Sequence, residues 1–240
     1  MTHGRDTTCV AFVPGFMQHP EAWAPVLARV RRRYRVATVE FEEPTLEASL
    51  RAIRNAGRGC VVIGYSMGGR LALRAVLREP HEYRALVLLG ATPGIENEGQ
   101  RRARKAADDD LADWMETSSI VAVANHWENQ PVFVTQSRDV VERQRRGRLS
   151  HDPKRLAAML RATGQGALEP VWDELPNLRL PVLAVAGERD DRYAQIAQRM
   201  ADALPDGRAA LVPRAGHATH LEEPDAFADL LLDFLHQHFG

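Results

Sequence analysis

The sequence predicts an α/β fold in which a mainly parallel sheet of about six strands is flanked by helices and carries an inserted helical lid. The first observation is size, because 240 residues that are 45% hydrophobic can bury roughly 70 to 75% of their surface in one domain. The second is a regular alternation of short apolar runs with helical patterns, which is typical of a parallel sheet covered on both faces. The third is a lapse of that alternation between residues 95 and 172.

Six apolar runs have the length and the Val, Leu and Ile content of buried strands. In chain order they are Cys9 to Val13, Val36 to Phe41, Cys60 to Ile63, Ala85 to Leu89, Val182 to Ala186 and Ala209 to Val212.

Five segments between and after these runs have helical periodicity. The last of them has apolar residues such as Phe227, Leu231 and Phe234 at three- and four-residue steps, so one stripe of this helix is expected to pack on the sheet. The five segments are Glu21 to Arg33, Leu46 to Ala56, Met67 to Arg78, Asp191 to Leu204 and Asp225 to His238.

Residues 95–172 are more charged, and their pattern is helical. We interpret them as a lid inserted into a core made of residues 1–94 and 173–240. Within the lid, the run Arg101 to Asp113 is more typical of a solvated helix face with near-neighbour charge pairs than of a ligand site.

Composition excludes several classes of protein. A formal charge of -1 argues against nucleic-acid binding through bulk electrostatics, and no window reaches the roughly 18 uncharged apolar residues of a membrane span. The N-terminus carries no recognisable secretion signal, which predicts a cytoplasmic protein. Cys9 and Cys60 each lie in an apolar run, and in that compartment reduced, buried thiols are expected rather than a disulfide.

The third apolar run leads directly into Gly64-Tyr65-Ser66-Met67-Gly68 and then into a helical pattern. Strand, sharp turn and helix are the context that a G-x-S-x-G nucleophile elbow requires. The glycines are needed because a Cβ would clash in so tight a turn, while the serine hydroxyl is held exposed at a helix N-terminus. Ser66 is therefore the candidate reactive hydroxyl.

A serine hydroxyl needs an imidazole to take its proton and a carboxylate to orient that imidazole. Asp190 and His217 follow two later strands, and the carboxyl ends of parallel strands are where such sheets keep their sites. Asp191 and His220 are the alternatives. We assign Asp191 to the cap of the following helix and interpret His220 as a packed or capping residue, which leaves Ser66, Asp190 and His217 as the triad.

Two backbone N–H groups are expected to stabilise a developing oxyanion, those of Met67 and of Phe16 in the loop after the first strand. No His and Cys cluster has metal-binding spacing, and neither a P-loop nor a dinucleotide-binding turn is present. We therefore expect no metal and no cofactor.

Four segments carry a resemblance to known proteins. The whole pattern resembles the α/β-hydrolase fold, without its usual first hairpin, and more narrowly the 2-succinyl-6-hydroxy-2,4-cyclohexadiene-1-carboxylate synthases of menaquinone biosynthesis. The segments are GYSMGGRLAL (Gly64 to Leu73), HWENQPVF (His126 to Phe133), GERDDRY (Gly187 to Tyr193) and GHATHLEEPDAF (Gly216 to Phe227).

The resemblance implies a lyase that expels pyruvate from 2-succinyl-5-enolpyruvyl-6-hydroxy-3-cyclohexene-1-carboxylate, with Ser66 as the base. This substrate is a small polycarboxylate, and guanidinium groups suit carboxylates. By their neighbouring sequence, the residues that match the substrate-binding positions of the family are Tyr65, Arg70, Arg104, Trp127 and Arg148.

One departure from the family is Pro14-Gly15, where His-Gly is usual. Proline has no N–H and a fixed φ, so the oxyanion loop is expected to be braced differently. Two alternatives to the lyase stay open: a carboxylesterase or C–C bond hydrolase that forms an acyl-enzyme at Ser66, and a non-catalytic ligand-binding relative. The sequence leaves the oligomeric state open.

Overall fold

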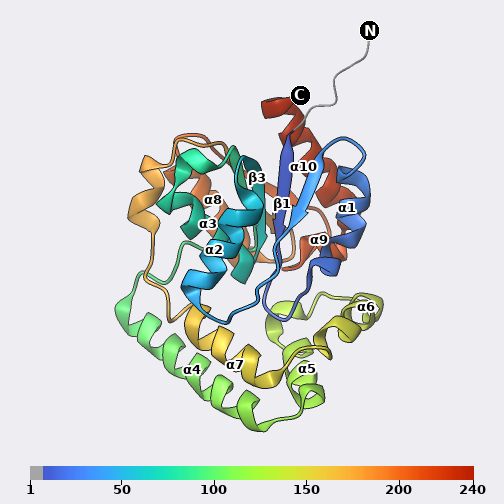
Figure 1. The fold of residues 1–240 in the computed structure, drawn as a ribbon, viewed down its shortest axis with the longest axis vertical. Coiled ribbons are helices and arrows are strands. Elements are labelled where there is room, and N and C mark those ends of the chain that lie inside the picture. Colours follow the sequence, from blue (N-terminus) through green and yellow to red (C-terminus); the bar gives the residue numbers. More distant parts are fainter. Residues whose placement is uncertain (1–7) are drawn as a thin grey trace.

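The computed structural model describes residues 8–240 and contains one six-stranded sheet in the order β2-β1-β3-β4-β5-β6, in which every neighbouring pair is parallel (Figure 1). Residues 1–7, part of the N-terminal segment expected to carry no secretion signal, lie outside the described range. The strands are β1 (Cys9–Val13), β2 (Arg35–Thr38), β3 (Cys60–Tyr65), β4 (Ala85–Leu89), β5 (Val182–Gly187) and β6 (Gly207–Val212).

Helices cover both faces of the sheet, so the predicted fold class is confirmed (Figure 1). One face is covered by α2 (Leu46–Gly57), α3 (Met67–Arg78) and α8 (Asp191–Ala203), and the other by α1 (Ala24–Val30) and α10 (Pro224–Phe239). Successive side chains of a strand point to opposite faces. The strands therefore supply two separate cores.

Strand β3 shows how this works, because Val62 packs in the core under α2, α3 and α8, while Val61 and Ile63 pack in the core under α1 and α10. The predicted first helix, in contrast, is divided into a 3-10 turn, η1 (Pro20–Trp23), and α1. Proline is suited to the first turn of a helix, and one lies in the first turn of α1, so a new helix starts there. The remaining short elements are η2 (Pro80–Glu82), η4 (Trp172–Asn177) and α9 (Thr219–Glu222).

The segment between β4 and η4 folds as a helical layer across one end of the sheet (Figure 1). Its small core, which includes Met115, Val123 and Leu160, also takes in Met17 from the loop after β1. The layer therefore packs on the loops that follow the strands. It consists of α4 (Glu98–Thr117), α5 (Ile120–Glu128), η3 (Pro131–Phe133), α6 (Arg138–Arg148) and α7 (Pro153–Thr163).

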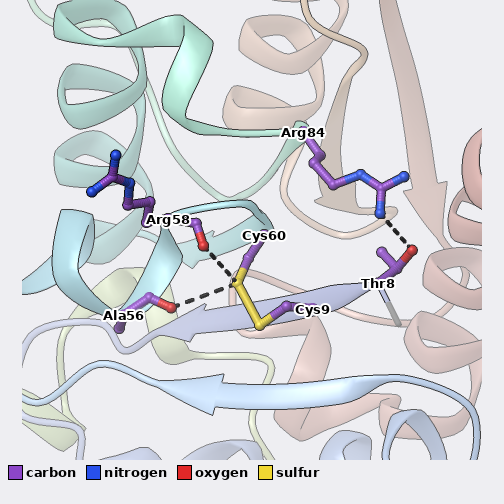
Figure 2. The surroundings of a disulfide bond; sticks show 6 residues. All are labelled: Thr8, Cys9, Ala56, Arg58, Cys60 and Arg84. Atoms are coloured by element: carbon purple, nitrogen blue, oxygen red, sulfur yellow. Dashed lines mark hydrogen bonds between the residues drawn. A yellow bond between two sulfur atoms is a disulfide. The ribbon is translucent and has the colours of Figure 1, made fainter. Parts of the chain in front are cut away.

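The expectation of two reduced thiols is wrong: Cys9 and Cys60 form a disulfide (Figure 2). The register of β1 and β3 sets the two residues directly opposite each other, with their Cα atoms 4.5 Å apart, which is within bonding range. Apolar neighbours in the sequence carry no information on this register. The carbonyl oxygens of Ala56 and Arg58 lie 3.7 and 3.6 Å from the sulfur of Cys60; since a disulfide sulfur carries no hydrogen, these are close contacts.

Disulfides are uncommon in cytosolic proteins, so this bond weighs against the cytoplasmic expectation, which stays a prediction. Among residues 8–240, no helix is both long enough and apolar enough to span a bilayer.

Candidate active site

Ser66 lies at the sharp turn between β3 and α3, with φ 50° and ψ -110°. This strained conformation requires neighbours without side chains. A Cβ on Gly64 would come within 2.6 Å of the backbone of Gly69, and one on Gly68 within 2.3 Å of the Pro14 carbonyl oxygen. The two glycines thus let the backbone double back and hold the Ser66 hydroxyl at the start of α3.

His217 contacts this hydroxyl, and Asp190 contacts His217, so residues from three distant parts of the chain form one hydrogen-bonded series. Nε2 of His217 lies 3.2 Å from Oγ of Ser66, and Nδ1 of His217 lies 2.8 Å from Oδ2 of Asp190. His217 and Asp190 are almost enclosed, with side-chain exposures of 4% and 13%. In this geometry the imidazole can take the hydroxyl proton while the carboxylate stabilises the resulting imidazolium.

The assignment of the helix cap to Asp191 is wrong. Asp190 is the N-cap of α8, where its Oδ1 accepts the backbone N–H of Tyr193 at 3.3 Å, and Asp191 is the first helical residue. A carboxylate has two oxygens that can serve separate partners. The two tasks are not exclusive, because Asp190 performs both.

Aromatic rings enclose the imidazole of His217. The ring centres of Tyr193, Tyr65 and Phe133 lie 4.5, 5.4 and 6.2 Å from it. Burial raises the pKa of Tyr65 well above its ordinary value. This phenol therefore remains neutral beside the triad.

The interpretation of His220 as a packed residue agrees with the structure. Its ring packs at a tilt between those of Trp23 and Tyr65, with centroids 4.3 and 4.4 Å away, and it is fully buried. Burial lowers the pKa of His220 to about 3, so this imidazole is neutral at physiological pH.

The two residues expected to donate to an oxyanion, Phe16 and Met67, lie at the same cavity as Ser66. Phe16 and Met67 both line the cavity that contains Ser66 and His217, and neither backbone N–H donates to another atom of residues 8–240. The loop is braced by Gln18, whose side-chain oxygen accepts the N–H of Gly15 at 3.1 Å. The expectation that Pro14 changes the bracing of this loop relative to the family stays a prediction.

The cavity measures about 590 Å³ and lies between the carboxyl ends of the strands and the lid. Arg70, Arg104 and Trp127 line it together with the triad. Arg70 is 8% exposed, and its only hydrogen bond to a described residue goes from Nη2 to the carbonyl oxygen of Thr163 at 3.2 Å. Its Nε is buried without a partner in the described chain, and burial lowers its pKa to about 10. An anionic ligand would satisfy this guanidinium.

Two expected substrate-binding residues do not line the cavity. Arg148 is 3% exposed and its Nη1 lies 3.2 Å from Oε1 of Glu128, which also pairs with Arg145. Tyr65, the elbow residue before Ser66, is buried and packs against the loop after β1, where a Cβ on Gly15 would come within 2.6 Å of its ring. Neither side chain is therefore in a position to contact a ligand in this cavity directly.

The cavity also contains polar residues that sequence reasoning missed. Asp108 accepts Nε of Arg104 at 2.8 Å, and Gln165 donates to the Tyr193 hydroxyl at 3.2 Å. Asp108 lies four residues after Arg104, which the family resemblance had already assigned to substrate binding, and this spacing was the available signal. Gln165 gave none. No group of three or more His, Cys, Asp or Glu side chains within residues 8–240 could hold a metal ion.

Comparisons with known proteins agree with this architecture. A profile of the alpha/beta hydrolase family matches residues 10–230. The solved structure of MenH from S. aureus superposes with a TM-score of 0.90 at 26% identity, over 99% of this chain and 97% of that one. The enol-lactonase from Burkholderia xenovorans LB400 superposes with a TM-score of 0.77 at 19% identity, over 98% of this chain and 94% of that one, a likeness of fold alone.

Curated relatives give the narrower similarity. A putative 2-succinyl-6-hydroxy-2,4-cyclohexadiene-1-carboxylate synthase of Bacillus subtilis (strain 168) is 38% identical over 177 residues, which are 72% of this chain and 65% of the relative. The synthase of Escherichia coli O1:K1 / APEC is 34% identical over 163 residues, covering 68% of this chain and 63% of the relative. The match thus spans less than two thirds of the length of these relatives.

Proposed function

Because the chain belongs to the alpha/beta hydrolase family, we propose that it is a carbon–oxygen lyase that eliminates pyruvate from 2-succinyl-5-enolpyruvyl-6-hydroxy-3-cyclohexene-1-carboxylate. The similarity to curated 2-succinyl-6-hydroxy-2,4-cyclohexadiene-1-carboxylate synthases, which are named for the other product of this elimination, supports this choice of reaction within the family. The observation that carries the proposal is Arg70. This buried guanidinium, whose Nε has no partner among residues 8–240, shares one cavity with Ser66 and His217.

The reaction begins with loss of a proton from the carbon beside the succinyl ketone. Ser66 Oγ takes this proton while passing its own to Nε2 of His217, 3.2 Å away. The electron pair of the broken C–H bond forms an enolate, whose oxygen would be stabilised by the N–H groups of Phe16 and Met67. No acyl-enzyme is required.

Elimination then completes the reaction. The electrons of the enolate return through the ring, the C–O bond to the enolpyruvyl group breaks, and pyruvate leaves as its enolate. The imidazolium of His217 returns its proton to this leaving group by way of Ser66. Asp190, with Oδ2 2.8 Å from Nδ1, stabilises the charged imidazole during the intervening step.

Two arginines would bind the carboxylates of the substrate. Arg70 approaches the cavity from the first turn of α3, and Arg104 approaches it from α4 of the lid. Trp127 adds an apolar wall, since its ring packs 4.9 Å from Phe16 and 5.7 Å from Phe133. The cavity therefore combines cations with apolar surface, as a ring that carries several carboxylates requires.

Release of pyruvate, coupled to lactate dehydrogenase and NADH, tests the proposal. Ser66→Ala should lower kcat by several orders of magnitude, because it removes the base. Arg70→Ala should raise KM roughly 10- to 100-fold, the typical effect of losing a charge-assisted contact. The matched control is Arg78→Ala, which removes an exposed guanidinium from the last turn of the same helix and should leave both constants unchanged.

Two outcomes would overturn the proposal. Pyruvate release at the wild-type rate in Ser66→Ala would exclude this serine as the base. Faster turnover of p-nitrophenyl esters than of the enolpyruvyl compound, with burst kinetics and an acyl group on Ser66, would assign the site to an esterase.

A further inference from the structure

We propose that Glu222 is a positioning residue for the catalytic imidazole, acting through the backbone on both sides of His217. This inference deepens the proposed function and rests on it, because it concerns the same imidazole. It arises from a carboxylate that the reaction scheme does not use.

Both oxygens of Glu222 are engaged by the loop that carries His217. Oε2 accepts the N–H of Gly216 at 2.9 Å, and Oε1 accepts the N–H of Ala218 at 3.0 Å. The two donors are the residues immediately before and after His217. One carboxylate therefore holds the backbone at both sides of the imidazole.

The backbone of Glu222 closes the same arrangement. Its N–H donates to the carbonyl oxygen of Ala218 at 2.9 Å, while its side chain accepts the N–H of Ala218. Glu222 is thereby bonded to Ala218 through both its side chain and its backbone. Because α9 is only four residues long, this ring of hydrogen bonds, rather than the helix, fixes the place of His217.

The loop has limited support from regular structure. It follows β6, which ends at Val212, and it contains Arg214 with a φ of 61°. On its other side, Gly216 lies against the lid, since a Cβ there would come within 1.9 Å of the Thr135 hydroxyl. Displacement of this backbone would lengthen the 3.2 Å contact between His217 and Ser66, and small errors of alignment are costly in proton transfer.

The neighbouring glutamate offers a matched control. Glu223 pairs with Arg214, with Oε1 3.2 Å from Nε and Oε2 3.0 Å from Nη2, and accepts no N–H from the residues flanking His217. Glu222→Gln and Glu223→Gln remove the same charge at adjacent positions. In Glu222→Gln, one of the two carboxylate oxygens becomes an amide NH₂, which cannot accept a hydrogen bond. The backbone N–H of either Gly216 or Ala218 is then left without an acceptor, and Glu223→Gln has no such effect.

The experiment compares these two variants with the wild-type chain. In Glu222→Gln, kcat for pyruvate release should fall about 10- to 100-fold while KM changes less than about threefold, as expected for loss of alignment. In Glu223→Gln, both constants should remain at the wild-type values. Circular dichroism and thermal denaturation give the folded fraction to which each kcat is normalised.

Proton NMR supplies a readout that a purely structural role would not move. The Nδ1 proton of His217, hydrogen-bonded to Asp190, should give a downfield resonance in the wild type and in Glu223→Gln, assigned by its absence in His217→Gln. In Glu222→Gln the resonance should broaden or disappear, because the imidazole is no longer held.

The results separate the two proposals. A kcat within threefold of wild type in Glu222→Gln, or a reduced kcat with an unchanged Nδ1 resonance, would overturn the role of Glu222. If the wild-type chain releases no pyruvate, the proposed function fails. In that case the NMR comparison, which needs no substrate, still decides whether Glu222 positions His217.

Discussion

Asp190 contacts His217 with one carboxylate oxygen and caps the N-terminus of helix α8 with the other. Oδ2 lies 2.8 Å from Nδ1 of the imidazole, and Oδ1 accepts the N–H of Tyr193 at 3.3 Å. The orientation of the imidazole is therefore coupled to the start of α8. A rigid helix terminus fixes the carboxylate before any substrate binds, which limits the reorganisation needed during proton transfer.

Asp190→Asn should separate these two tasks. Asparagine caps helices about as well as aspartate, so the free energy of unfolding should change by less than about 1 kcal/mol. In contrast, kcat should fall about ten thousandfold, because the neutral amide cannot stabilise the imidazolium. Steady-state kinetics and urea denaturation measure the two effects. Asp191→Asn, at the first helical residue, is the control and should retain full activity; a similar loss of kcat there would contradict the assignment.

Stability should decrease as the pH falls below about 6.5 because of His220. Burial lowers the pKa of His220 to about 3 in the folded chain, against about 6.5 when unfolded. The unfolded state therefore binds more protons between these values, and stability falls with pH. Between pH 7 and pH 5 the loss should be roughly 2 kcal/mol.

Urea denaturation at the two pH values checks this expectation. His220→Phe keeps an aromatic ring between Trp23 and Tyr65 and should reduce the loss by roughly the same 2 kcal/mol. His151, whose pKa burial lowers to about 4, contributes in the same direction in both proteins. An unchanged pH dependence in His220→Phe would show that another group is responsible.

Glu128→Ala should destabilise the lid. The side chains of Glu128 and Arg148 are 9% and 4% exposed, and removal of one partner of a buried ion pair costs about 3 to 5 kcal/mol. Thermal and urea denaturation measure the change. Glu142→Ala removes an exposed carboxylate from α6 and should have an effect within about 0.5 kcal/mol. Equal stability of the two variants would mean that the pair with Arg148 is not formed in solution.

Reduction of Cys9–Cys60 should lower the free energy of unfolding. The bond links residues 51 apart in sequence, for which chain entropy predicts a stabilisation of about 4 kcal/mol. Thiol titration of the unfolded, unreduced chain should find no free thiol. The double variant Cys9→Ala/Cys60→Ala should not respond to a reductant, and two titratable thiols before reduction would disprove the bond.

Much of the architecture was predictable because it depends on short-range patterns. Apolar runs such as Ala85 to Leu89 coincide with a strand, since a strand buried on both faces has apolar side chains throughout. The turn at Ser66 was recognisable because glycines are needed within two residues of it. Candidates for the imidazole and carboxylate followed from strand ends, where parallel topology gathers the loops.

Contacts between distant elements could not be obtained in this way. The pairing of Cys9 with Cys60 depends on the register of β1 against β3. Arg148 is paired with Glu128 of the preceding α-helix instead of lining the cavity. The proposed placement of His217 depends on the carboxylate of Glu222. The sequence by itself determined where strands, helices and the elbow form, because periodicity and turn chemistry act over a few residues. Only the tertiary structure decided which side chains share a partner, because that choice depends on packing between segments that no local pattern connects.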